Sequence, residues 1–395
     1  MSPLRFAPLV VAAGLLFAAE SVEIPNPAPA ESGQAYLTTA PDGSVYLAWI
    51  EPSGKGHRLQ YAQRTGDSWR SLGSIASGEN WFVNWADYPT LLPLGNEEFA
   101  AHWLEKAGAT QYTYGIKIAQ SRPGKTPWRV AFAPKVPRKG QYTGFVSLVA
   151  LPGGGIGGSY LAPGLKGGEG EEDKSLHFVR IAPDGSVVSD DLIDPDVCTC
   201  CQTAAAVTAD GPIVAYRDHL GGEIRDISVV RLINGKWTAP HPLHEDGWHI
   251  NACPVNGPAL AASGREVTAA WYTGADDKPA VYAAFSSNSG ATFGSPVRID
   301  QGAPLGRVGL VQLPDGEAIV SWIEKIPGAD GSVAGAQIRI RRVDSRGHAG
   351  PAQTVTPINP GRSSGFPKMV HSNGKLLLAW TSDRVRTAEI PLPSR

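Results

Sequence analysis

The sequence predicts an all-β fold, a β-propeller of four-stranded antiparallel blades, with seven blades favoured and six as the alternative. The main observation is a repeat, because an aromatic residue closes a short β-type run at intervals of 51 to 58 residues, and a fixed period of about 50 residues is typical of propellers. The repeated residues are Trp49, Trp103, Tyr160, Tyr216, Trp271, Trp322 and Trp380. The chain is also rich in turn residues, with 46 glycines and 33 prolines, as short strands joined by tight turns require. No helical period competes with this pattern.

The first 21 residues read as an export signal, which leaves residues 22–395 as a single propeller domain. Arg5 precedes a continuous apolar run of 14 residues at 6–19. This run is too short to span a bilayer and has the length of a signal-peptide core. Cleavage is expected after Ser21, or as far along as Ala30. We therefore expect a periplasmic or secreted protein with no transmembrane segment after signal removal; an uncleaved anchor is the alternative.

Each repeat unit can be divided into four strands, as the fifth unit illustrates. Its inner strand is expected at 258–262, the second at 267–272, the third at 280–286 and the fourth at 296–300, with Gly264 in the first turn. Alternating apolar residues bounded by Gly, Asp and Asn are typical of half-buried antiparallel strands.

The last unit is too short to supply its own outer strand. The chain ends soon after the β-type run at 385–390. We expect residues 21–25 to provide the missing strand and to close the ring, because a closed ring leaves no long unpaired strand edge. In the third unit, the Gly- and Glu-rich stretch at 164–174 is expected to be a solvated loop insertion.

One turn in the fifth unit resembles the Asp box of the sialidase-like propellers. The segment SSNSGATF carries Ser286, Gly290, Thr292 and Phe293 at the expected spacing, with Asn288 where an Asp is usual. The resemblance implies a structural turn between the third and fourth strands. It also implies that substrate binds at the opposite face, where the loops between blades and the loops after the second strands meet around the channel mouth.

The resemblance implies that three arginines at this mouth bind the carboxylate of an acidic sugar. We assign this role to Arg217, Arg225 and Arg307, since a guanidinium can bind a carboxylate with two parallel hydrogen bonds. The alternative is that Arg217 and Arg225 pair with acidic neighbours and brace their own loop. Further substrate-binding candidates at the same mouth are Trp85, Tyr272 and Glu324.

The same resemblance implies a catalytic acid/base and a tyrosine nucleophile activated by a glutamate. Asp87 is the candidate acid, because neighbouring aromatic residues would raise its pKa; the alternative is an Asp that caps the turn before a proline. Tyr216 with Glu223 is the candidate nucleophile pair, and Tyr272 with Glu324 is the alternative pair. No cofactor is expected.

All four cysteines fall in two inter-blade loops. They are Cys198, Cys200 and Cys201 in one loop and Cys253 in the next. In an exported protein an even number of cysteines favours disulfides, here two. The first alternative is a copper or zinc site, with His249 as a weak further ligand candidate. Redox-active thiols are the second alternative.

Composition limits the possible partners. Only 18% of residues are charged, the formal net charge is −2, and lysine and arginine are scattered along the chain, so no nucleic-acid partner is expected. We expect a monomeric, exported sialidase-like propeller, a glycoside hydrolase that acts on or binds an acidic sugar or another small acidic ligand. The alternatives are a non-catalytic binding or scaffold propeller and a periplasmic metal-binding protein that uses the cysteine loops.

Overall fold

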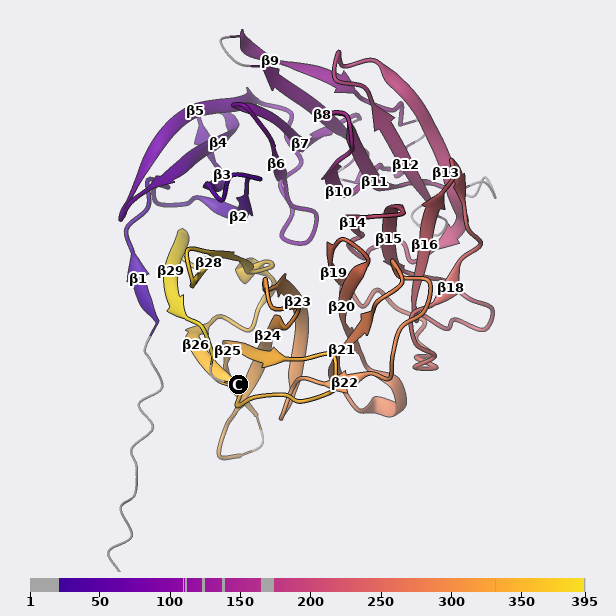
Figure 1. The fold of residues 1–395 in the computed structure, drawn as a ribbon. Coiled ribbons are helices and arrows are strands. Elements are labelled where there is room, and N and C mark those ends of the chain that lie inside the picture. Colours follow the sequence, from indigo (N-terminus) through magenta and orange to yellow (C-terminus); the bar gives the residue numbers. More distant parts are fainter. Residues whose placement is uncertain are drawn as a thin grey trace, which may run out of the picture.

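The computed structural model describes residues 21–395, except for residues 109, 111, 123–124, 137–138, 165–173, 331 and 394. Nearly all of the predicted export signal and most of the predicted loop insertion at 164–174 therefore lie outside the described residues. Seven antiparallel sheets are arranged around a ring (Figure 1). The predicted seven-bladed propeller is confirmed, and the six-bladed alternative is wrong. In the part of the chain that the structure describes, no helix is long and apolar enough to cross a membrane.

The strands follow one order in every blade, from the channel outwards. The inner strands contact one another around the channel, and they are β2 (Gly33–Thr39), β6 (Thr90–Gly95), β10 (Gly144–Ala150), β14 (Ala204–Thr208), β19 (Ala259–Ser263), β23 (Pro304–Gln312) and β27 (Lys368–Ser372). The second strands are β3 (Val45–Ser53), β7 (Glu98–Lys106), β11 (Ile156–Pro163), β15 (Gly211–Arg217), β20 (Glu266–Thr273), β24 (Ala318–Pro327) and β28 (Lys375–Thr381).

The outer half of each blade is more irregular. The third strands are β4 (Gly56–Thr65), β8 (Tyr114–Arg122), β12 (Lys174–Ile181), β16 (Ile227–Ile233), β21 (Ala280–Ser286), β25 (Val333–Val343) and β29 (Val385–Pro391). The outer strands are β5 (Ser68–Gly78), β9 (Lys125–Phe132), β13 (Val187–Val197), β17 (Lys236–Trp237) with β18 (His241–Pro242), β22 (Val297–Arg298), β26 (Gln353–Ile358) and β1 (Val22–Ile24). Two single-turn helices, η1 (Ala275–Asp277) and η2 (Arg362–Ser364), lie in loops.

The ring closes in the way that the short last repeat predicts. Strand β1 pairs antiparallel with β29, with Val22 opposite Glu389 and Ile24 opposite Thr387 (Figure 1). The side chain of Asn26 strengthens this junction by donating to the backbone oxygen of Val385 at 3.2 Å. The seventh blade is therefore built from both ends of the described chain.

The repeated aromatic residues lie on the second strands and are buried. Six of them donate their N–H or O–H group to a carboxylate, because a buried Trp or Tyr needs a partner for its polar group. These pairs are Trp49–Glu51, Trp103–Glu105, Tyr160–Asp190, Tyr216–Asp194, Trp271–Asp246 and Trp322–Glu324. The period in the sequence thus marks a structural position that each blade fills with a large ring.

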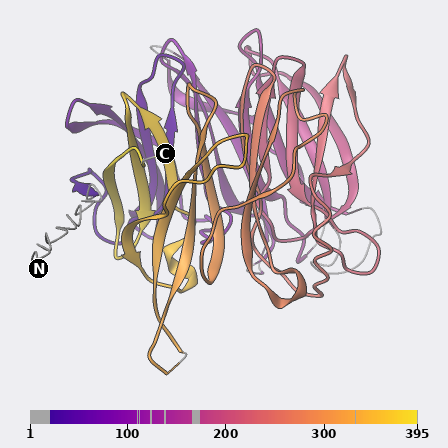
Figure 2. The same cartoon turned by 60° about the horizontal axis from the view of Figure 1, so that its bottom comes forward.

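The turn that resembles an Asp box joins β21 to β22. Ser286 Oγ accepts from the backbone N–H of Gly290 at 2.9 Å, and Asn288 Oδ1 accepts from that of Thr292 at 3.0 Å. Gly290 has a φ of 76°, which favours glycine at this position. The strands run between two end faces of the ring (Figure 2), and this turn lies at the end opposite the loops that follow the second strands.

Candidate functional site

A cavity of about 330 Å³ opens at the end of the ring where the inter-blade loops meet. We call it the mouth cavity. Its walls come from the loops before β6, β19 and β27, from the start of β23, and from the last residues of β20 and β24. These are the two classes of loop that the resemblance implied. Its functional side chains are three aromatic residues and three cations, namely Trp85, Trp248, Tyr272, Arg307, Lys325 and Arg362.

The three mouth cations, Arg307, Lys325 and Arg362, are not neutralised by the protein. Among the described residues none of them forms an ion pair with a carboxylate, and no Asp or Glu side chain lines the mouth cavity. Burial, together with the charge of Arg362, lowers the pKa of Arg307 to about 10. Like charges held close together in this way attract an anion.

Neutral groups orient Arg307. Its Nη1 donates to Ser364 Oγ at 2.8 Å and to the backbone oxygens of Gly361 at 3.1 Å and Gly365 at 3.2 Å. Its guanidinium carbon lies 4.8 Å from the centroid of the Trp85 ring. Neutral groups thus fix the position of the guanidinium, and its positive charge is not neutralised by these contacts.

The aromatic walls of the mouth cavity are also braced. Trp85 stacks on Phe366 with a centroid distance of 6.0 Å, and Trp248 contacts Tyr272 edge to face at 5.6 Å. Asp226 holds the Trp248 loop, because its carboxylate accepts from the backbone N–H of Trp248 at 2.9 Å. Fixed rings of this kind offer flat apolar surface to a ligand at little cost in conformational entropy.

Of the three arginines predicted to bind a carboxylate, only Arg307 lines the mouth cavity. Arg217 is 1% exposed, and it donates to the backbone oxygens of Asn256 at 2.9 Å, Tyr272 at 2.7 Å and Arg225. Its guanidinium carbon also lies 4.7 Å from the centroid of the Trp248 ring. In this structure Arg217 braces the loops behind the cavity, so the predicted three-arginine arrangement is not assembled.

Arg225 and Glu223 contact each other at 2.6 Å between Nη2 and Oε2. His219 lies on the other side of Glu223, with 3.3 Å between Nε2 and Oε1. The Arg225 hydrogen bond lowers the pKa of Glu223. This local pairing is the alternative that the sequence left open.

The predicted nucleophile Tyr216 is one of the repeated aromatic residues. Its hydroxyl donates to Asp194 Oδ2 at 2.6 Å rather than to Glu223, and its side chain is 1% exposed. Burial, with the nearby charges of Asp218 and Asp194, raises the pKa of Tyr216. In the alternative pair, Tyr272 lines the mouth cavity, whereas Glu324 binds Trp322 and Arg339. The nucleophile role stays a prediction for both tyrosines.

Asp87 lies in the loop before β6 and contacts the first residues of the inner strand β10. Its Oδ1 accepts from the backbone N–H of Phe145 at 2.8 Å, and its Oδ2 accepts from the Tyr114 hydroxyl at 3.2 Å. Burial raises the pKa of Asp87 to about 7, a value that suits a general acid near neutral pH. The carboxyl group is 2% exposed and does not line the mouth cavity, so its catalytic role also stays a prediction.

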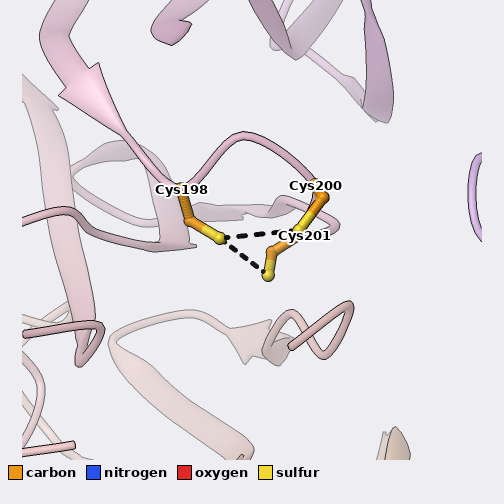
Figure 3. A group of neighbouring side chains, drawn as sticks. All are labelled: Cys198, Cys200 and Cys201. Atoms are coloured by element: carbon orange, nitrogen blue, oxygen red, sulfur yellow. Dashed lines mark hydrogen bonds between the residues drawn. The ribbon is translucent and has the colours of Figure 1, made fainter. Parts of the chain in front are cut away.

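Three of the cysteines, Cys198, Cys200 and Cys201, form a cluster (Figure 3), and the fourth, Cys253, lines the mouth cavity. The sulfur of Cys198 lies 3.0 Å from that of Cys201 and 4.0 Å from that of Cys200, whereas a disulfide bond measures about 2.05 Å. None of the four cysteines forms a disulfide in the structure, so the predicted disulfides are not formed. Hydrogen bonds from Cys200 and Cys201 lower the pKa of Cys198. His249 is exposed and is not part of the sulfur group.

No protein-family model matches the chain, and no curated protein matches its sequence. Solved structures do match. An ulvan lyase of polysaccharide lyase family PL25 has a TM-score of 0.56 at 11% identity, over 94% of each chain. A Hadza microbial sialidase has a TM-score of 0.53 at 11% identity, over 86% of this chain and 74% of that chain. A mutant α-L-arabinofuranosidase of Fusarium graminearum, bound to an iminosugar inhibitor, has a TM-score of 0.51 at 11% identity, over 94% and 97%.

The chain has the fold of the sialidase-like propellers. At 11% identity the likeness concerns the fold alone. Two of the mouth cations, Lys325 and Arg362, were not among the residues predicted to bind substrate. Both nevertheless lie in the predicted loop classes, Lys325 directly after Glu324 near the end of β24 and Arg362 before β27. A search of those loops for cations without a nearby carboxylate would have found them.

Proposed function

We propose that this propeller binds an acidic carbohydrate in the mouth cavity. The observation that carries the proposal is the set of mouth cations, which have no carboxylate partner among the described residues and lie beside aromatic walls. A carboxylate of the ligand would neutralise the mouth cations, which no described carboxylate of the protein neutralises. We further propose, from the apolar run at 6–19, that the protein works in the periplasm or outside the cell.

Three features support a sugar rather than another small anion. The cavity is open and combines a few polar groups with aromatic surface, which is the usual character of a ligand site. Its fixed rings can pack against the apolar face of a pyranose. The similar structures are named as a sialidase, an arabinofuranosidase and a polysaccharide lyase, all of which act on carbohydrates.

Binding is better supported than hydrolysis. Glycoside hydrolases generally place two carboxyl groups, or a tyrosine in the sialidases, against the scissile bond. Among the described residues no carboxylate lines the mouth cavity, and Asp87 and Tyr216 are buried behind it. Hydrolysis through Asp87 and Tyr216 would need a movement that exposes both side chains.

The proposal is tested by calorimetric titration with N-acetylneuraminic acid, glucuronic acid and galacturonic acid, with glucose and galactose as neutral references. We expect an acidic sugar to bind, and Arg307→Gln to weaken that binding at least about 10-fold, because it removes a buried charge-assisted contact. Arg346→Gln is the matched control, since it removes the same charge from an exposed position at the opposite end of the ring. Equal affinity for neutral sugars, or equal effects of the two variants, would contradict the proposal.

Turnover is assayed on the same protein with fluorogenic α-sialosides and uronides. We expect none, since no described carboxylate lines the mouth cavity. Turnover that Asp87→Asn abolishes would instead establish the hydrolase that the resemblance implied.

A further inference from the structure

The sulfur atoms of Cys198, Cys200 and Cys201 lie close together in the loop between β13 and β14. All three lie within 4.8 Å of one another (Figure 3). Three sulfurs that each lie about 2.3 Å from a shared ion in a trigonal arrangement would be about 4 Å apart, and Cys198 and Cys200 are separated by 4.0 Å. The Cys198–Cys201 distance of 3.0 Å is shorter than this, so these two sulfurs would have to move apart to bind a shared ion. The approach of three sulfurs, where a disulfide needs only two, favours a metal site.

The backbone around these cysteines is held in place before any ion binds. The backbone N–H of Cys198 donates to the oxygen of Arg217 at 3.1 Å, and Val197 pairs with Asp218. On the other side, Gln202 donates to the oxygen of Ala86 at 2.8 Å. A loop fixed at both ends holds the sulfurs together at little entropic cost.

We propose that Cys198, Cys200 and Cys201 bind one Cu(I) ion as three thiolates. Thiolates are soft ligands that select Cu(I) and zinc, and Cu(I) is stable with three of them. Zinc in a structural site takes four ligands. The next candidate, Cys253, contacts Cys200 but is exposed and belongs to a separate loop. Each thiol gives its proton to solvent on binding, and because copper enters as Cu(I), no electron is transferred.

Two arginines near Cys198 would offset the negative charge of such a site. Three thiolates and one Cu(I) carry a net charge of −2, and Arg217 and Arg225 both interact electrostatically with Cys198. Arg225 uses one nitrogen for Glu223, while its Nε–H is buried and donates no hydrogen bond in the structure. A buried donor of this kind costs free energy unless an anion accepts from it. A thiolate cluster beside it would supply that anion.

The test titrates the reduced full-length protein with Cu(I) in competition with bicinchoninate, and counts sulfur neighbours by copper X-ray absorption. We expect about one Cu(I) per chain with three sulfur neighbours. Cys198→Ser should weaken binding by about 100-fold or more, because loss of a ligand exceeds the effect of losing an outer contact. Cys253→Ser is the matched control and should retain the affinity. Circular dichroism confirms that both variants fold.

Several outcomes would overturn the proposal. One is Cu(I) binding to the parent protein that is no tighter than to Cys198→Ser. A second is a four-sulfur shell that Cys253→Ser destroys, with zinc preferred over copper. A third is a Cys198–Cys201 disulfide in protein exported and purified without reductant. Acidic-sugar binding measured on Cys198→Ser keeps the two proposals separate, since it should match that of the parent protein.

Discussion

Two hollows at opposite ends of the propeller differ in how their cationic side chains are paired with carboxylates. At the end that carries the turns between inner and second strands, Arg342 contacts both Asp315 and Glu317, and Arg395 reaches the same carboxylates at 3.0 Å and 3.1 Å. These residues line a hollow of about 880 Å³, larger than the mouth cavity. At the other end the three mouth cations are left without such partners.

The difference teaches that the size of a hollow is a weaker guide to function than its charge balance. Paired surface charges give the fold modest stability and offer a ligand little. Neighbouring cations without counter-charges cost stability, and proteins usually keep such arrangements at sites that use them. We therefore assign function to the smaller cavity.

The largest expected effect concerns Arg217, which is buried and does not line the mouth cavity. Arg217→Met should destabilise the protein by about 3 kcal/mol or more, because three buried carbonyl oxygens lose their donor. Arg346→Met, at an exposed site, should stay within about 0.5 kcal/mol of the parent protein. Chemical denaturation of both variants measures the two values. Equal stability would mean that Arg217 is free to serve a ligand, contrary to the contacts described above.

A second expected effect is a pH dependence of stability that arises from the buried Asp87. Its pKa of about 7 in the folded state lies above the ordinary value of 3.8, so between about pH 4 and pH 7 the folded state holds a proton that the unfolded state has lost. The Asp87 contribution to stability must therefore fall as pH rises through that window. We expect Asp87→Asn to gain stability relative to the parent protein from pH 4 to pH 7.

His102 makes the variant comparison necessary. Burial lowers the pKa of His102 to about 3, so this residue contributes a stability change of the opposite sign, a loss as pH falls below its ordinary pKa. The difference between the parent protein and Asp87→Asn, measured by denaturation at several pH values, cancels that background. A difference that does not change with pH would show that Asp87 keeps an ordinary pKa.

The smallest effect contrasts one arginine from each end. Arg342→Gln should lose about 1 kcal/mol of stability, since it leaves Asp315 and Glu317 paired only with Arg395, whose side chain is mostly exposed. Arg362→Gln should change stability by less than about 0.5 kcal/mol, while it weakens acidic-sugar binding. Denaturation and calorimetry on the same two variants check this. A larger loss of stability for Arg362→Gln than for Arg342→Gln would contradict the assignment of Arg342 as the paired arginine and Arg362 as the unpaired one.

The fold was readable in the sequence because its signals are local. The period of Trp49 and its counterparts marks the second strand of each blade. The short last repeat predicted a closing strand at residues 21–25, and the structure has it at Val22–Ile24. The loop classes also led to Trp85, Tyr272 and Arg307, which line the mouth cavity.

The site was less readable because its character depends on contacts between blades. Tyr216 reads as a candidate nucleophile until Asp194, 22 residues earlier, is seen to accept its hydroxyl. Lys325 and Arg362 matter because no described carboxylate lies opposite them, which depends on how neighbouring blades are placed. The cysteine spacing was visible, but the convergence of three sulfurs arises from the loop anchored by Cys198 and Gln202.

The pairing of β1 with β29 also has a consequence for how the protein folds. It joins residues that are 363 to 367 positions apart, whereas each of the first six blades is formed from one continuous segment. Contacts between residues so far apart in sequence form slowly, because the entropy cost of closing the intervening loop must be overcome first. We therefore expect closure of the ring to follow formation of the first six blades.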